Sequence, residues 1–166
     1  MKKALTVSNI LSWVNLVISS GFVLFMLAAF FMYPALPVLF SVILIGSIAL
    51  HSYAAIQLHK SILYPTIPLS KQTPTGIRLM GYISLFFAFM LFVNGIYALQ
   101  ETKELIAQMQ VPDQFKKINF TAIIHSIGVF FMVFSLGVIL NVLLNFRFLR
   151  AYLILQLEKE KAGEEA

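Results

Sequence analysis

The chain has 166 residues, of which 60% are hydrophobic, 14% aromatic and only 11% charged, and its formal net charge is +5. Soluble chains of this size are typically about 25% charged and about 45–50% apolar, because a small domain cannot bury more apolar surface than that. The composition therefore indicates an integral membrane protein. The sequence has no cysteine, which excludes disulfides, thiolate nucleophiles and Cys-ligated zinc or iron–sulfur centres.

Four long apolar stretches follow one another along the chain. Each exceeds the about 20 residues that a helix needs to cross a hydrocarbon core about 30 Å thick. The first is too long for the apolar core of a signal peptide, and we expect it to be retained. We predict an all-α fold, an integral membrane four-helix bundle with antiparallel up-down topology, in a single membrane domain over 1–166. Its spans are roughly 8–32, 36–58, 77–99 and 120–146, with a polar outer loop at 100–119 and a cytoplasmic C-terminal helical tail at 147–166.

Lysine and arginine are unevenly divided between the two sides that these spans define. Nine lie on the side of the termini and the middle loop, and three lie on the other side. The positive-inside rule then places both termini and the middle loop in the cytoplasm. We expect a multi-pass protein of the cell (inner) membrane. The nine are Lys2, Lys3, Lys60, Lys71, Arg78, Arg147, Arg150, Lys159 and Lys161; the three are Lys103, Lys116 and Lys117.

Small and polar residues recur at helical spacing within the spans. Lipid tails are as apolar as leucine, so membrane helices associate through close van der Waals approach and interhelical hydrogen bonds rather than through hydrophobic burial. One stripe of small or polar residues on each span therefore predicts the faces that pack together. The residues that we expect in helix packing are Ser12, Asn15, Ser19, Gly81, Ser84, Ala88, Gly95 and Gly128.

Four further polar residues in the spans are candidates for lining a cavity or contacting a partner: His51, His125, Asn141 and Asn145. Ionisable groups inside a span are costly and usually face the bundle interior. The alternative role for these residues is packing alone. A haem shared by His51 and His125 is disfavoured, because their positions in the spans differ in depth by roughly 15 Å, whereas two axial ligands lie within about 4 Å of each other.

The sequence shows no catalytic constellation. It contains no H-E-x-x-H, no G-x-S-x-G and no phosphate-binding loop, and no Asp or Glu lies in the spans to orient a histidine. We predict a non-enzymatic accessory or scaffold subunit of a membrane assembly, without catalytic, cofactor or metal sites. Its expected partners are the lipid bilayer and other membrane subunits or further copies of itself, and not nucleic acid.

Two other functions remain as alternatives. One is a small oligomeric transporter or channel in which Asn15, Ser19, His51 and His125 line a polar cavity. A chain with four spans is small for a self-contained carrier, so this function would require oligomerisation. The other alternative, a membrane-embedded redox or lipid-modifying enzyme, is the least favoured, because the spans carry no carboxylate.

Overall fold

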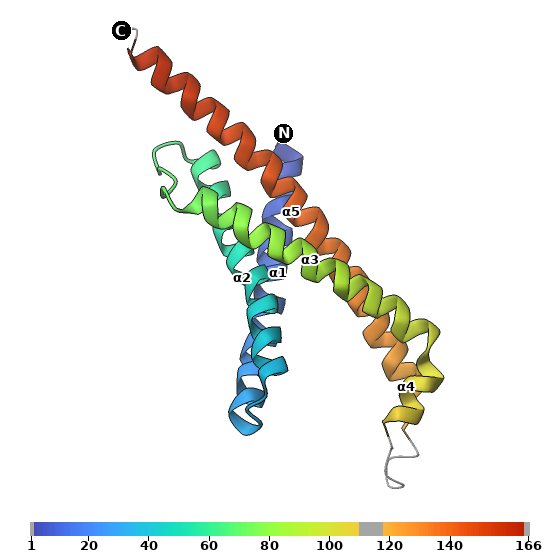
Figure 1. Cartoon of the computed structure of the whole chain (residues 1–166). Coiled ribbons are helices and arrows are strands. Elements are labelled where there is room, and N and C mark those ends of the chain that lie inside the picture. Colours follow the sequence, from blue (N-terminus) through green and yellow to red (C-terminus); the bar gives the residue numbers. More distant parts are fainter. Residues whose placement is uncertain (1, 110–117, 165–166) are drawn as a thin grey trace.

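The chain folds into helices only, over the parts that the computed structural model describes, residues 2–109 and 118–164 (Figure 1). The helices are α1 (Lys2–Met32), α2 (Leu36–Leu63), α3 (Thr73–Gln100), α4 (Thr102–Gln108) and α5 (Phe120–Glu164). Four of them, α1, α2, α3 and α5, are long and apolar enough to cross a bilayer. The predicted all-α class with four long apolar helices is confirmed. Residues 110–117 of the predicted outer loop lie outside the described residues.

Prolines mark the beginnings of α2 and α3. Pro37 and Pro74 are each the second residue of their helix. A proline is tolerated there because the first-turn N–H groups have no partner within the helix. At the other end of α2, the backbone N–H of Tyr64 donates to Lys60 O at 2.8 Å. Pro65 and Pro68 follow at once and help to keep the α2–α3 connection out of the helix.

The long helices form two pairs that separate toward one end of the molecule. Helices α1 and α2 pack together along much of their length, as do α3 and α5. The pairs meet mainly where α2 packs on α3 and α1 packs on α5, whereas the described backbones of α1 and α3 do not approach each other closely. Both termini and the α2–α3 connection lie at one end (Figure 1). The pairs diverge toward the other end, which carries residues 33–35 and α4, so the helical bundle is closed at one end and open at the other.

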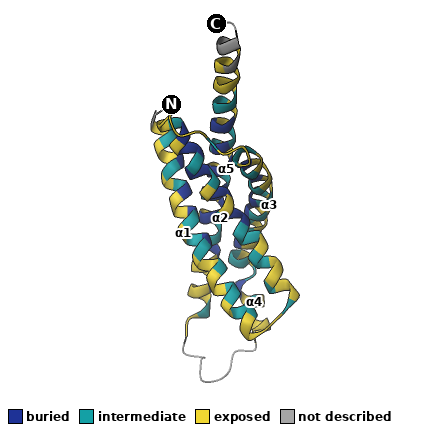
Figure 2. Cartoon of the chain, turned by 90° about the vertical axis from the view of Figure 1, so that its left-hand side faces the viewer, coloured by how far each residue is buried: buried dark blue, intermediate teal, exposed yellow. Residues whose placement is uncertain are grey.

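Two apolar clusters hold the pairs together. The first joins α2, α3 and α5 where the pairs cross, and consists of Ile48, Ala88, Phe134, Val138 and Val142. The second lies toward the end that carries the termini, and consists of Leu58, Ile77, Phe148 and Leu149. Buried residues follow the inner faces of the helices, while the outward faces are largely exposed (Figure 2). Many of these exposed residues are large and apolar, such as Val17, Leu24 and Val133.

Helix α5 is much longer than the other helices. Its 45 residues correspond to about 68 Å at the rise of an α-helix, about twice the thickness of a hydrocarbon core. The segment predicted as a C-terminal helical tail is helical and continues α5 without a break as far as Glu164. Its last turns extend beyond the other helices (Figure 2). Helix α3, by contrast, ends at Gln100, and α4 begins two residues later with Thr102, whose Oγ1 donates to Ala98 O at 2.6 Å.

Candidate functional site

Helix α1 is attached to α5 through a buried polar network. The Ser8 hydroxyl donates to Asn145 Oδ1 at 2.9 Å, and the Ser12 hydroxyl donates to Asn141 Oδ1 at 3.0 Å. The two asparagines are also joined, because Asn145 Nδ2 donates to Asn141 Oδ1 at 3.0 Å. All four side chains are fully buried. The network therefore connects the first and last helices of the chain.

The spacing of the polar residues explains why this network forms. The fully buried residues of α1 in the described chain are all polar, namely Ser8, Ser12, Asn15 and Ser19. Steps of four, three and four residues keep them on one face of a helix, and Asn141 and Asn145 share a face because they are one turn apart. In an apolar environment these groups gain most by bonding to each other, so the two faces meet.

A second set of polar contacts joins α2 to α3. The hydroxyls of Ser47 and Ser84 lie 3.3 Å apart, and His51 Nδ1 lies 3.1 Å from the backbone oxygen of Ile77. The His51 ring also meets Phe146 edge-on, with ring centroids 6.2 Å apart. The histidine is thus held by a backbone carbonyl of α3 and an aromatic ring of α5, at the junction of three helices.

Several buried polar atoms of this region have no hydrogen-bond partner among the described residues. They include Asn15 Nδ2, His51 Nε2, Ser52 Oγ and Asn141 Nδ2. A buried polar group without a partner costs about 1–3 kcal/mol. The polar interior therefore retains donors and acceptors that could bond to a small polar molecule. Ser52 was not predicted to belong to this polar interior, although a serine in the middle of a long apolar stretch indicates a residue that faces another helix.

All eight residues predicted to pack helices together are buried. The closest approach is between α3 and α5 at Gly95 and Gly128. A Cβ atom added to Gly95 would lie 2.8 Å from Gly128 O, and one added to Gly128 would lie 3.0 Å from Gly95 O. No side chain fits in that space, so glycine at both positions lets the two backbones touch. The eight are Ser12, Asn15, Ser19, Gly81, Ser84, Ala88, Gly95 and Gly128.

The four candidate cavity or partner residues do not form one site, although Asn141 and Asn145 are hydrogen-bonded to each other. His51, Asn141 and Asn145 are buried within the chain, whereas His125 is exposed. His51 contacts α5 at Phe146, which lies 21 residues beyond His125 on the same helix. At the rise of an α-helix this separates the two histidines by about 30 Å along α5. Among the residues that the structure describes, no group of three or more His, Cys, Asp or Glu could hold a metal ion.

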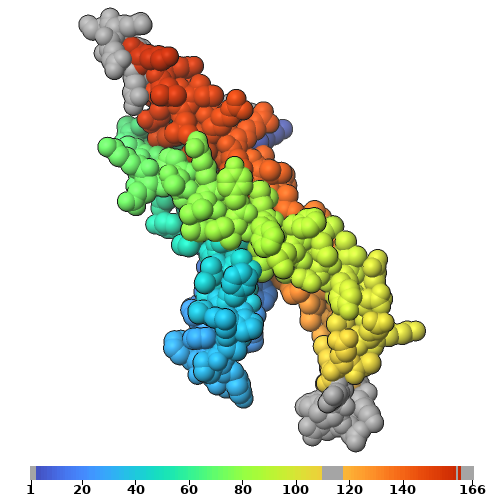
Figure 3. All heavy atoms as spheres, in the orientation of Figure 1, coloured from blue at the N-terminus to red at the C-terminus, as the bar shows by residue number. Residues whose placement is uncertain are grey.

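An apolar cleft opens where the two helix pairs diverge (Figure 3). It has a volume of about 190 Å³ and receives side chains from all four long helices. The Phe130 ring lines the cleft and stacks on the Phe134 ring, with centroids 5.8 Å apart. It is tilted against the Phe22 ring of α1, with centroids 6.1 Å apart. The cleft was not predicted from the sequence, although three phenylalanines within five residues of α5 indicate an aromatic surface there. The lining residues are Phe22, Met26, Ser41, Ile45, Phe87, Leu91, Phe130, Phe131 and Phe134.

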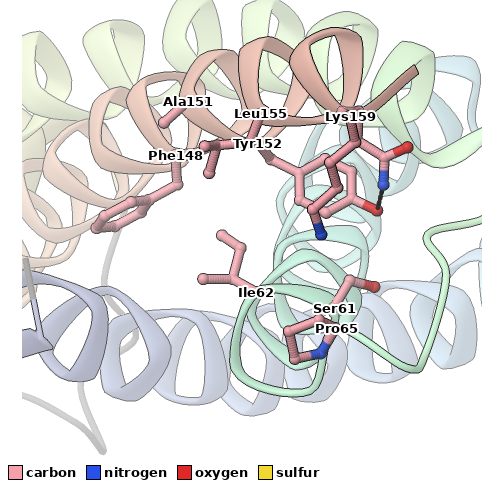
Figure 4. A pocket seen from close by; sticks show the side chains of 9 residues that line it. Ser61, Ile62, Pro65, Phe148, Ala151, Tyr152, Leu155 and Lys159 are labelled. Carbon is pink, nitrogen blue, oxygen red and sulfur yellow. Dashed lines mark hydrogen bonds between the residues drawn. The ribbon is translucent and has the colours of Figure 1, made fainter. Parts of the chain in front are cut away.

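A smaller hollow lies at the closed end, between the end of α2 and the last part of α5 (Figure 4). Its volume is about 140 Å³. The Tyr152 hydroxyl at its rim accepts hydrogen bonds from Gln156 Nε2 at 2.7 Å and from the backbone N–H of Leu69 at 3.4 Å. Tyr152 therefore ties the α2–α3 connection to α5. Ser61, Ile62, Pro65 and Lys159 also line the hollow.

A comparison with protein-family models, with curated proteins and with solved structures finds no match for this chain. Its residues form a buried polar junction, an apolar cleft at the open end and a small hollow at the closed end.

Proposed function

We propose that this chain is a multi-pass membrane protein that serves as a non-enzymatic scaffold or accessory subunit of a membrane assembly. The observation that carries the proposal is the apolar cleft between the two helix pairs, which all four long helices line. In this proposal the cleft receives a transmembrane helix, either from another subunit or from a second copy of the chain. The four helices cross the bilayer in antiparallel, up-down order.

Two features support a position in the membrane. The outward faces of the long helices carry large exposed apolar side chains, which lipid tails solvate and water does not. Lysine and arginine gather in the segments at the end that holds the termini and the α2–α3 connection, nine against three. By the positive-inside rule, that end lies in the cytoplasm. We further propose that the membrane is the cell (inner) membrane.

The shape of the bundle supports a role in assembly. The polar network and the second apolar cluster attach the helix pairs to each other near the closed end, and the first cluster joins them where they cross. The cleft is therefore a gap between two packed halves. Its aromatic walls can pack against the side chains of another helix, and aromatic residues are common in the cores of protein interfaces. Inserting a helix there would bury apolar surface of all four spans at once.

The size of the native particle tests this proposal. We expect the protein, extracted in a mild detergent, to elute and weigh as an oligomer or as a complex with another membrane protein. Substituting Ile45→Trp would fill the cleft and reduce the assembled fraction. Leu50→Trp is the matched control, because Leu50 is on the same helix, is 56% exposed and lies outside the cleft. A monomeric wild-type particle with no companion protein would contradict the proposal.

A small oligomeric transporter is the alternative, and the polar atoms without partners at Asn15, His51 and Ser52 favour it. In that case solute flux into liposomes that contain the purified protein should fall when His51 is replaced by phenylalanine. Flux that is absent from the wild-type protein, or unchanged by the substitution, would contradict transport through this polar interior. The exposed position of His125 means that it could line a path only between protomers.

A further inference from the structure

A groove with two arginines lies between α3 and α5 at the closed end of the molecule. Its volume is about 340 Å³, and it is lined by Arg78, Tyr82, Phe146, Leu149 and Arg150. The two guanidinium groups come from different helices, and both side chains are exposed. The groove therefore combines two positive charges with an apolar, aromatic floor.

The floor of the groove depends on a glycine of α3. A Cβ atom added to Gly81 would lie 2.6 Å from Cζ of Phe146, so only glycine lets this ring rest against α3. Tyr82 then packs beside Phe146, with ring centroids 5.3 Å apart. Leu149 is buried at 2% exposure and closes the inner side. The packing of α3 on α5 thus fixes the aromatic surface beneath the two arginines.

The charges of Arg78 and Arg150 are not neutralised within the described chain. Neither side chain forms an ion pair or a hydrogen bond with another described residue. The sequence has no Asp or Glu before Glu101 and none between Asp113 and Glu158, so both arginines stand in long stretches without a carboxylate. The groove therefore presents an uncompensated pair of guanidinium groups.

We infer that this groove binds the phosphate group of an anionic phospholipid, with Arg78 and Arg150 on the phosphate and the aromatic floor beneath the glycerol and upper acyl chain. Guanidinium groups bind phosphate oxygens through paired hydrogen bonds, and Tyr is a typical residue of the membrane interface. A zwitterionic headgroup would bring its ammonium group toward the same two positive charges, which favours an anionic headgroup. The inference rests on the membrane position and orientation proposed above, which put this end of α3 and α5 at the inner leaflet.

The test uses the full chain in lipid nanodiscs and in vesicles of phosphatidylglycerol mixed with phosphatidylcholine, with the lipids retained after purification counted by native mass spectrometry. We expect the wild-type protein to retain phosphatidylglycerol in preference. Arg78→Gln with Arg150→Gln should weaken retention by about tenfold for each arginine removed, because each loses charge-assisted hydrogen bonds to phosphate. Arg147→Gln is the matched control, since Arg147 is exposed on α5 but does not line the groove.

A second pair of substitutions separates the site from general surface charge. The double variant Arg78→Lys with Arg150→Lys keeps the net charge but loses the planar guanidinium groups that bind phosphate through paired hydrogen bonds. Retention of phosphatidylglycerol should therefore fall to a level between those of the wild type and the double glutamine variant. Equal losses in Arg147→Gln and the glutamine pair, or equal retention of phosphatidylcholine, would overturn the inference. Displacement of the lipid by millimolar inorganic phosphate would overturn the assignment of the phosphate to a lipid.

The same samples distinguish a failure of the lipid site from a failure of the proposed membrane position. A protein that incorporates into the vesicles but shows no preference for phosphatidylglycerol would refute the groove alone. A protein that stays in solution when the vesicles are collected would refute the membrane position on which the groove depends.

Discussion

Asn141 is the central residue of the polar network, because its Oδ1 atom accepts hydrogen bonds from both Ser12 and Asn145. Replacing it with leucine removes both bonds and leaves the Ser12 hydroxyl to find another acceptor. Interhelical hydrogen bonds in membrane proteins contribute about 0.6 kcal/mol on average and up to about 1.7 kcal/mol. We therefore expect Asn141→Leu to lower the free energy of unfolding by about 1–2 kcal/mol, measured by denaturant titration in detergent.

The control for Asn141→Leu is the same change at Asn94, an exposed residue near the far end of α3. Asn94→Leu should shift the unfolding free energy by less than about 0.5 kcal/mol, as surface substitutions usually do. Equal effects of the two substitutions would show that the network between α1 and α5 does not stabilise the fold.

The backbones of α3 and α5 touch at Gly95 and Gly128, so a larger residue at Gly95 should destabilise the fold. In Gly95→Ala the new methyl group would lie 2.8 Å from Gly128 O and 2.8 Å from Cγ of Met132 unless α3 moves away from α5. Overpacking of this kind costs about 1–3 kcal/mol. We expect a lower melting temperature in detergent, followed by the loss of the monodisperse peak on size exclusion after heating.

Gly137→Ala provides the comparison on α5, because a Cβ atom there meets nothing within 4 Å. Alanine is the better helix former by about 1 kcal/mol, so this substitution should leave the melting temperature unchanged or raise it. If Gly95→Ala were as well tolerated as Gly137→Ala, the two helices would not be in backbone contact.

Single residues also show where sequence reasoning succeeds and where it stops. The repeat of Ser12, Asn15 and Ser19 identifies one face of α1, because period alone places residues on a face. The spacing of residues along the sequence does not determine which helix that face contacts. The hydrogen bonds of Ser8 to Asn145 and of Ser12 to Asn141 are therefore known only from the structure. His125 shares a stripe with Gly128, yet only Gly128 is buried, since each residue's burial depends on which helix lies opposite it.

At the scale of elements, Tyr152 connects the last helix to the α2–α3 connection through its bond with the N–H of Leu69. Tyr152→Phe removes this acceptor and should let the connection open more often. A single hydrogen bond contributes about 1 kcal/mol, so trypsin cleavage after the exposed Lys71 should become about fivefold faster if local opening precedes cleavage. The measurement is the rate at which the full-length band disappears.

Tyr64→Phe is the matched substitution, because Tyr64 lies at the end of α2, is 60% exposed and has no hydroxyl hydrogen bond to a described residue. Its cleavage rate should equal that of the wild type. Faster cleavage of both variants by the same factor would mean that Tyr152 does not hold the connection against α5.

The helices themselves were more predictable than their arrangement. Apolar length identifies four helices long enough to cross a membrane, and Pro37 and Pro74 indicate where two of them begin. The divergence of the two pairs depends on packing between distant segments, such as Phe130 against Phe22. The groove of Arg78 and Arg150 was missed for the same reason, since its two arginines lie 72 residues apart in the sequence.

The proposed topology of the whole molecule has four membrane crossings with both termini in the cytoplasm. The absence of cysteine makes this directly measurable, because any introduced cysteine is the only thiol of the chain. Four exposed positions are suitable. Tyr33 and Gln108 lie toward the open end, and Thr66 and Leu157 lie toward the closed end.

The most direct test is to label these four single-cysteine variants in spheroplasts with a membrane-impermeant thiol reagent, before and after permeabilisation. If both termini are cytoplasmic, Tyr33→Cys and Gln108→Cys should react in intact spheroplasts, whereas Thr66→Cys and Leu157→Cys should react only once the membrane is opened. Labelling of Thr66→Cys or Leu157→Cys in intact spheroplasts, or recovery of the protein in the soluble fraction, would contradict this topology.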